Sequence, residues 1–236
     1  MTTMTDIPTQ SKRFVKAQSY PWPFDGDLRP ENTALLVIDM QHDFCSAGGF
    51  IDRLGLPTGS THACIEPIKR VLEAMRAGGY HIIHTREGHR RDAADLPATK
   101  AWRAKRGGAP IGSTPGPRGM ALTRGEPGWQ IVPELAPLAH EPVIDKPGKG
   151  AFYATDLDAI LRLHGIDNLV FTGVTTDVCV HTTLREANDR GYECLLLEDC
   201  CAAINPKSHD MAVWQVKTGA IFGAATHSAD LLEAIA

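Results

Sequence analysis

The stretch Asn168-Leu-Val-Phe-Thr-Gly-Val174 is almost entirely apolar, and a helical pattern over residues 177–190 follows it, closed by Gly191. A second apolar run, Tyr192-Glu-Cys-Leu-Leu-Leu-Glu198, comes directly afterwards. Strands of this kind, separated by a helix, are typical of parallel pairing, in which helices bury both faces of the sheet. This stretch therefore predicts an α/β fold.

The same alternation continues on both sides of this unit. The remaining predicted strands and helices are strands at 33–40, 80–86, 142–146 and 219–225, and helices at 63–77, 156–164 and 207–217. Ser228 is the predicted cap of a last helix. The expected fold is a three-layer α/β/α arrangement with a central, mostly parallel six-stranded sheet.

Two regions depart from this rhythm. Residues 1–32 contain the cluster Tyr20-Pro-Trp-Pro-Phe24, and its prolines predict an extended N-terminal arm whose expected role is to cover a subunit contact. Residues 33–236 form the predicted domain, and about 87–140, rich in Gly, Pro and Arg, form a loop insertion within it. The chain is therefore expected to hold a single domain.

Composition excludes several classes of function. The chain has 236 residues and a formal net charge of −4, which gives no general attraction to nucleic acid or to an anionic membrane. No apolar run is long enough for a membrane-spanning helix, and the first thirty residues lack a signal peptide. We therefore expect a cytoplasmic protein whose six cysteines are reduced.

Three polar features fall at the ends of different predicted strands. They are Asp39, Lys146 and the segment Thr175-Thr-Asp-Val-Cys179. Because ligands of an open parallel sheet bind beyond the carboxyl ends of its strands, we expect these features to meet in one crevice. An acid in such a place is either a helix cap or a proton-transfer group, and a lysine beside it would keep acid and thiol charged.

Cys179 differs from the other cysteines through its position. An arbitrary cysteine is usually a small core residue, but a thiol at the start of a helix is expected to have a lowered pKa and to be reactive. The other five show no CxxC spacing, and His81, His84 and His89 fit core or surface positions better than a metal site. With no glycine-rich phosphate loop either, we expect no metal and no organic cofactor.

At this point three motifs carry a family resemblance. The segments 35–44 (LLVIDMQHDF), 146–152 (KPGKGAF) and 172–180 (TGVTTDVCV) resemble the isochorismatase-like cysteine hydrolases. The resemblance implies a catalytic triad of Asp39, Lys146 and Cys179. It also implies a cis peptide between Val174 and Thr175, and an oxyanion hole formed by the backbone N–H groups of Thr175 and Cys179.

Finer details narrow the choice within this family. Residues 20–24, 85–90, 122–129 and 185–192 are similar to the biuret and triuret amidohydrolases, with ureidoacrylate amidohydrolases as the next nearest relatives. Nicotinamidases carry a metal site that Asp52-Arg-Leu54 does not supply, and isochorismatases proper lack the cysteine. The expected reaction is hydrolysis of a terminal C–N bond of a small uncharged urea-type molecule through a thiocarbamoyl-enzyme. Triuret would give carboxybiuret and ammonia, and biuret would give allophanate and ammonia.

Two alternatives stay open beside this reaction. The first is hydrolysis of ureidoacrylate or of another carbamoyl or amide substrate, and the second is a non-catalytic binding or redox-sensing protein on the same fold. The candidate substrate contacts are Gln41, Phe44, Arg86, Glu87, Lys149, Phe152, Tyr153 and Thr218. By ungapped counting, Thr218 takes the place of a substrate-binding glutamine of the biuret hydrolases, and its shorter side chain would suit triuret.

The relatives also suggest a homo-oligomer, either a tetramer or a dimer. Arg124 and Trp129 of the insertion are placed to reach the site as a lid or from a neighbouring subunit. Whether the insertion or the arm completes a neighbouring subunit's site stays open at this stage.

Overall fold

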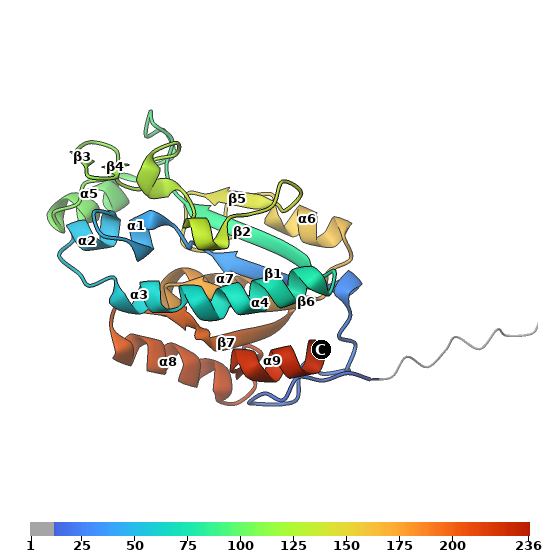
Figure 1. The fold of residues 1–236 in the computed structure, drawn as a ribbon. Coiled ribbons are helices and arrows are strands. Elements are labelled where there is room, and N and C mark those ends of the chain that lie inside the picture. The colour runs from blue at the N-terminus through green and yellow to red at the C-terminus, as the bar shows by residue number, and fades with distance from the viewer. Residues whose placement is uncertain (1–11) are drawn as a thin grey trace, which may run out of the picture.

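A six-stranded sheet forms the centre of the computed structural model, which describes residues 12–236 (Figure 1). The strands are β1 (Thr33–Ile38), β2 (His81–Glu87), β5 (Val143–Lys146), β6 (Asn168–Val174), β7 (Glu193–Ala202) and β8 (Ala224–Thr226). Their order is β5-β2-β1-β6-β7-β8, and every neighbouring pair is parallel. The predicted three-layer fold is confirmed, and the sheet is wholly rather than mostly parallel.

Helices cover both faces of the sheet. In Figure 1, α4 (Ile65–Ala77) and α9 (Ser228–Ile235) lie in front of the strands, while α6 (Leu157–Leu163) and α7 (His181–Asp189) lie behind. Helix α8 (Pro206–Lys217) packs its valines with α6 and α7. The period of two along β1 sends Leu35 towards α4 and Leu36 towards α7, so the central strands are buried on both sides.

Local chemistry moves several element boundaries from their expected places. A separate turn of helix, α3 (Gly59–Ala63), precedes α4, and residues 219–223 form a turn that leaves β8 shorter than expected. The prediction that Ser228 caps α9 is wrong, since the cap residue is His227. Ser228 instead donates from its N–H and its Oγ to the Asp199 carboxylate, at 2.7 and 2.6 Å.

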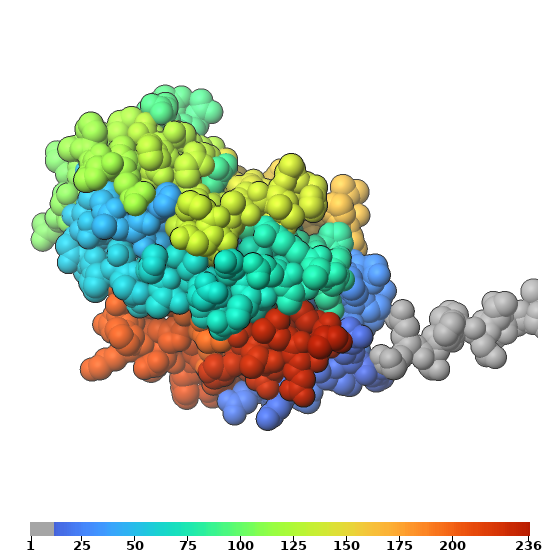
Figure 2. Space-filling model, viewed as in Figure 1, coloured from blue at the N-terminus to red at the C-terminus, as the bar shows by residue number. Residues whose placement is uncertain are grey.

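Residues 87–140 carry little regular structure. They contain α5 (Ala98–Arg106), the two-residue strands β3 (Pro115–Gly116) and β4 (Gly119–Met120), and two short 3₁₀ turns, Pro127–Trp129 and Pro133–Leu135. In Figure 2 this segment packs over the blue segment that holds α1 (His42–Cys45) and α2 (Phe50–Arg53). Asp43 joins the two regions, because its carboxylate accepts the N–H groups of Leu122 and Phe50 at 2.9 and 3.0 Å.

The described part of the arm, residues 12–32, lies against the chain's own sheet. Gln18 N–H donates to Ala225 O at 2.9 Å, and Ala225 N–H donates back to Gln18 O. Val15 and Trp22 are fully buried beside this contact. The arm therefore covers the edge strand β8 of its own sheet, which would otherwise expose unpaired backbone groups. Residues 1–11 of the predicted arm lie outside the described residues.

Within residues 12–236 we find no helix whose length and apolar content would let it cross a membrane. The six cysteines are all buried and unbridged.

Candidate active site

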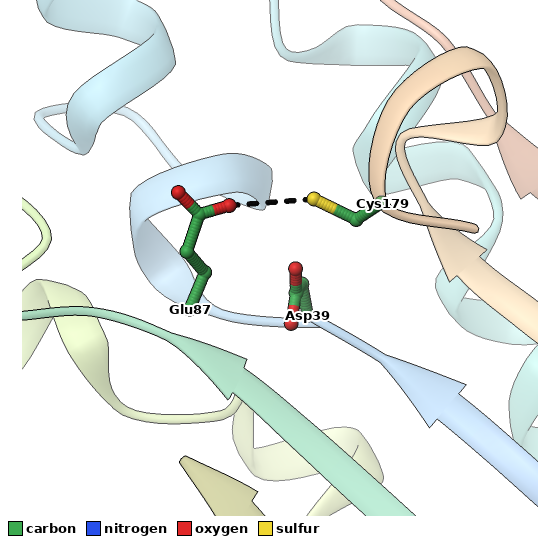
Figure 3. Close-up of side chains that lie close together, drawn as sticks. All are labelled: Asp39, Glu87 and Cys179. Atoms are coloured by element: carbon green, nitrogen blue, oxygen red, sulfur yellow. Dashed lines mark hydrogen bonds between the residues drawn. The ribbon is translucent and has the colours of Figure 1, made fainter. Parts of the chain in front are cut away.

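The carboxyl ends of four strands bring charged side chains together. Asp39 follows β1, Glu87 ends β2, Lys146 ends β5, and Cys179 lies in the turn after β6. The register places Glu87 directly beside Lys146 on neighbouring strands. Asp39, Glu87 and Cys179 each offer a ligand atom within 4.8 Å of the other two (Figure 3). The three predicted triad residues thus meet at one end of the sheet, together with Glu87.

Asp39 is held on both carboxylate oxygens. Lys146 Nζ lies 2.7 Å from Oδ2, and the Thr85 hydroxyl donates to Oδ1 at 2.6 Å. The backbone of Asp39 has a φ of +52°, and its N–H donates to Thr85. Lys146 Nζ also donates to the carbonyl oxygens of Gly148 and Lys149 at 3.0 and 2.9 Å, so its protons are fully used. These contacts hold the buried Asp39 carboxylate in place within 4.8 Å of the Cys179 sulfur.

The pKa of Lys146 is set by burial and by neighbouring charges. Burial acts to lower the pKa of Lys146, but Asp39, Cys179 and Glu87 outweigh it and hold that pKa above its usual range. The ammonium group of Lys146 is therefore charged at neutral pH. A buried ion pair of this kind is costly to break, because the remaining charge has no water to stabilise it.

Cys179 lies in a tight turn rather than in a regular helix. The Val174–Thr175 peptide is cis, as the resemblance implied, and residues Thr176–Val180 form one π-helical turn before α7 begins. The N–H groups of Val178 and Val180 both donate to the Thr175 carbonyl, at 3.1 and 3.2 Å. Figure 3 shows the Cys179 side chain pointing from this turn towards Glu87 and Asp39.

The resting thiol is neutral. Burial raises the pKa of Cys179 well above its usual value, and the carboxylates of Asp39 and Glu87 add to the rise against the opposing effect of Lys146 and Lys149. The expectation that the helix start would lower this pKa is wrong, because burial outweighs the helix dipole here. The thiol donates to Glu87 Oε2 at 3.3 Å.

Glu87 is surrounded by ammonium groups. Lys100 and Lys149 lie 2.7 and 2.8 Å from Oε1, and Lys146 lies 3.8 Å from Oε2. Burial would raise the pKa of Glu87, but these lysines outweigh it and hold the pKa far below the usual range. Glu87 and Lys149 were expected as individual substrate contacts, whereas no sequence pattern indicated Lys100, which lies on α5 in the irregular insertion.

The Gln41 side chain holds the backbone of two neighbouring segments in place. Its side-chain amide donates to the carbonyl oxygens of Glu87 and Trp129 at 3.0 and 2.9 Å, and its Oε1 accepts the Glu87 N–H at 2.8 Å. Gln41 therefore fixes the backbone of Glu87. Trp129 is held by the same amide and stacks under the Arg86 guanidinium, whose carbon lies 3.6 Å from the ring centre.

The other predicted substrate contacts lie outside this cluster. Arg86 is paired with Asp145 at 2.8 Å, and Phe44 is buried in the core on the α4 side. Phe152 stacks on Tyr192 at 5.9 Å, and Tyr153 is 64% exposed. The packing of both phenylalanines is that of core residues.

Thr218 lies far from the sulfur. Helix α8 begins beside the turn that holds Cys179, where His209 bonds Thr176 at 2.8 Å, and it runs back along the sheet. Thr218 follows the last residue of this 12-residue helix and lies nine residues beyond His209, which at 1.5 Å per residue is about 14 Å along the helix. The chain's own fold therefore does not bring Thr218 to the crevice.

The site is closed to solvent. Cys179 is 3% exposed, and Asp39, Glu87 and Lys146 are fully buried. The side chain of Lys149 is 44% exposed, and that of Lys100 is 14% exposed. Lys149 is thus the most exposed group of the cluster.

The same cluster is the one place, among residues 12–236, where three possible metal ligands lie close together. Its donor set is a poor fit for a divalent cation, because the lysines already neutralise both carboxylates. The three histidines considered in the sequence have separate partners: the His81 ring centre lies 5.2 Å from that of His164, His84 pairs with Glu141 at 3.1 Å, and His89 pairs with Asp95 at 3.3 Å.

Comparison with known proteins agrees with this geometry. The isochorismatase domain family matches residues 33–230. The ureidoacrylate amidohydrolase RutB of Azorhizobium caulinodans is 34% identical over 209 residues, covering 87% of this chain and 91% of its own length. A cysteine hydrolase structure from Pseudomonas syringae pv. phaseolicola superposes with a TM-score of 0.76 at 27% identity, covering 95% of this chain and 98% of that one.

A solved structure of an enzyme whose name states its activity shares the fold as well. The N-carbamoylsarcosine amidase of Thermoplasma acidophilum superposes with a TM-score of 0.63 at 26% identity, covering 84% of this chain and 96% of its own. The matched domain and the sequence relatives together show the family of this chain. The chain belongs to the isochorismatase family and is an isochorismatase-like amidohydrolase.

Proposed function

We propose that the protein hydrolyses a terminal C–N bond of a small urea-type substrate, triuret or biuret, with Cys179 as nucleophile. One observation carries the proposal: a buried thiol lies within 4.8 Å of a carboxylate that is paired with a buried lysine at 2.7 Å. Urea-like carbonyls are poor electrophiles, because nitrogen lone pairs are delocalised into them. Their hydrolysis therefore needs both a strong nucleophile and stabilisation of the oxyanion.

In the first half of the reaction, Asp39 takes the thiol proton while the sulfur attacks the terminal carbonyl carbon. The backbone N–H groups of Thr175 and Cys179 are proposed to stabilise the oxyanion. Asp39 then delivers the proton to the leaving nitrogen, ammonia departs, and a thiocarbamoyl-enzyme remains. Lys146, which lies 2.7 Å from Asp39, balances the charge of the carboxylate before and after each transfer.

In the second half, Asp39 activates a water molecule that attacks the thiocarbamoyl carbon. The C–S bond breaks, and the thiol regains its proton. Triuret gives carboxybiuret and biuret gives allophanate. Every proton in this scheme passes through Asp39, which exchanges it with the thiol, the leaving nitrogen or the water.

Ureidoacrylate is the second candidate substrate. The relative from Azorhizobium caulinodans, which is 34% identical to this chain, is named a ureidoacrylate amidohydrolase. The cluster also holds three ammonium groups against two carboxylates, so it has one positive charge to spare for an anionic substrate. Biuret, triuret and ureidoacrylate share the H₂N–CO–NH– group that the mechanism requires, and the remainder of the molecule distinguishes them.

The test is ammonia release from purified enzyme given biuret, triuret, ureidoacrylate or nicotinamide. We expect turnover of a urea-type substrate and none of nicotinamide. Cys179→Ser should abolish turnover and retain binding. Cys194→Ser is the matched control, since it replaces a buried thiol in β7, distant from the site, and should leave turnover unchanged.

Each outcome bears on a separate part of the proposal. Preference for ureidoacrylate would correct the substrate and leave the mechanism in place. Retained activity in Cys179→Ser would refute the assignment of the nucleophile. Release of ammonia from none of the four compounds would favour a binding or redox-sensing protein.

A further inference from the structure

Glu87 is fixed more firmly than a simple substrate contact requires. Its backbone N–H and carbonyl are both bonded to the Gln41 side chain, at 2.8 and 3.0 Å. Its Oε1 receives Lys100 and Lys149 at 2.7 and 2.8 Å. The side chain is fully buried, so water does not compete for it. The other oxygen, Oε2, accepts Lys149 Nζ at 3.1 Å and also the thiol of Cys179 at 3.3 Å (Figure 3).

In the closed site, the S–H group of Cys179 points to a carboxylate that does not act as the base in the proposed mechanism. The S–H group donates to Glu87 Oε2 at 3.3 Å and not to Asp39, the carboxylate that the mechanism needs as a base. Glu87 is an unsuitable base, since three ammonium groups lie within 4 Å of its oxygens and favour its ionised form. It therefore accepts hydrogen bonds throughout the reaction and carries no proton.

We propose that Glu87 is a positioning residue that holds the thiol proton in the empty site and gives up Oε2 to an N–H group of the bound substrate. This inference rests on the proposed function, because it needs a substrate that carries N–H groups beside the attacked carbonyl. Once Oε2 is taken, the thiol loses its partner and turns to Asp39, which lies within 4.8 Å. Activation of the nucleophile then depends on the presence of a substrate.

The step balances without any further reactant. The S–H bond breaks as its proton moves to an Asp39 oxygen, and the sulfur lone pair forms the C–S bond. The carbonyl π electrons move to oxygen. Glu87 exchanges one hydrogen-bond donor, the thiol, for another, the substrate N–H, and its charge does not change.

The charges that face the sulfur predict what removal of Glu87 does. Asp39 reaches the sulfur from the end of β1, Glu87 from β2, Lys146 from β5, and Lys149 from the loop after β5. Lys100 of α5 faces Glu87 itself. Loss of the Glu87 charge raises the excess of cations, from three ammonium groups against two carboxylates to three against one, so the thiolate becomes easier to form while the substrate loses an acceptor.

Glu87→Gln in the full chain separates these two effects. The first measurement is the pH profile of Cys179 alkylation by iodoacetamide in substrate-free enzyme, followed by mass spectrometry of the Cys179 peptide. We expect alkylation at pH 7 to rise more than about tenfold, with the midpoint of the profile moved to lower pH. A site that was merely loosened would show a faster reaction at every pH and an unmoved midpoint.

The second measurement is steady-state ammonia release. We expect kcat/KM of Glu87→Gln to fall more than about tenfold on the urea-type substrate, because a buried N–H donor is left without its acceptor. Glu87→Asp keeps the charge among the three lysines and withdraws the oxygen by one methylene. It should lose kcat/KM to a similar extent, with a much smaller shift of the alkylation midpoint.

Glu141→Gln is the matched control. Glu141 is a buried carboxylate paired with Arg76 and with His84, which lies in the middle of β2, three residues before Glu87, and its replacement should change neither measurement. An unmoved alkylation midpoint in Glu87→Gln, or full kcat/KM in either Glu87 variant, would overturn the inference. If the parent enzyme hydrolyses none of the substrates, the proposed function fails, while the alkylation profile still decides how Glu87 acts on the thiol.

Discussion

Thr85→Val tests whether Asp39 works as a fixed base. The Thr85 hydroxyl donates to Asp39 Oδ1 at 2.6 Å and accepts the Asp39 N–H at 3.2 Å, and both residues are fully buried. Valine keeps the shape and removes the hydroxyl. A hydrogen bond to a charged group contributes about 1.5–3 kcal/mol, so the free energy of unfolding should fall by this amount.

Thr172→Val is the matched control for this change. Thr172 is equally buried on the neighbouring part of the sheet, and its hydroxyl donates to the uncharged Leu36 carbonyl at 2.9 Å. Its replacement should cost about 0.5–1.5 kcal/mol, the usual contribution of a neutral hydrogen bond. The difference between the two variants isolates the charged acceptor, since the substitution and the burial are the same.

Both variants are measured by guanidinium chloride unfolding and by steady-state ammonia release. Thr85→Val should lose about 10- to 100-fold in kcat, because a misdirected carboxylate transfers protons poorly, whereas Thr172→Val should keep the parent kcat. Equal losses of stability and equal kcat values in the two variants would refute the reasoning. That result would mean that the Thr85 hydroxyl does not orient Asp39.

Three further predictions follow from single positions. Gly173 has a φ of +110°, and a Cβ there would collide with the backbone of Ile38, so Gly173→Ala should lower the free energy of unfolding by more than about 2 kcal/mol in thermal unfolding. Thr218→Gln should leave the triuret/biuret rate ratio unchanged, because Thr218 lies at the distant end of α8, and a changed ratio would show that this position reaches a site. The lysines around Glu87 hold its pKa below the ordinary 4.5 despite burial, so its stabilising effect is present above pH 4.5 and is lost as the pH falls towards the folded-state pKa. The slope of stability against pH below 4.5 should therefore be shallower in Glu87→Gln, and an identical slope would contradict this account of Glu87.

The sequence carries enough information to locate the crevice. Apolar strands are recognisable from composition, and Asp39, Lys146 and Cys179 each follow one of them. Parallel strands present their carboxyl ends at the same edge, so position along the chain was sufficient to bring these residues together. The same rule applies to Glu87, the last residue of β2, although its central place depends on lysines from other segments.

The remaining features depend on three-dimensional packing. Lys100 lies in an insertion without periodicity, and no local pattern indicates that its side chain reaches Glu87 at 2.7 Å. Ungapped counting placed Thr218 near the substrate, but such counting ignores that α8 runs away from the crevice along the sheet, where its last residue, Lys217, pairs with Glu198 in the middle of β7. The predicted thiolate at Cys179 considered the helix start alone, and the burial of the thiol could be known only after folding.

A neutral thiol in a closed site is consistent with hydrolysis of a poor electrophile. The cluster carries one more ammonium group than carboxylates, so it is not neutralised until a negative charge forms on the sulfur or on the substrate oxygen. That charge appears in the transition state and is absent from the resting enzyme, which is the condition under which an interaction accelerates a reaction. If Cys179 were always ionised, its negative charge would neutralise the surplus positive charge of the lysines before the substrate arrived. Because its raised pKa keeps Cys179 neutral at rest, the surplus positive charge of the lysines stays available for the step in which the carbonyl oxygen becomes an oxyanion.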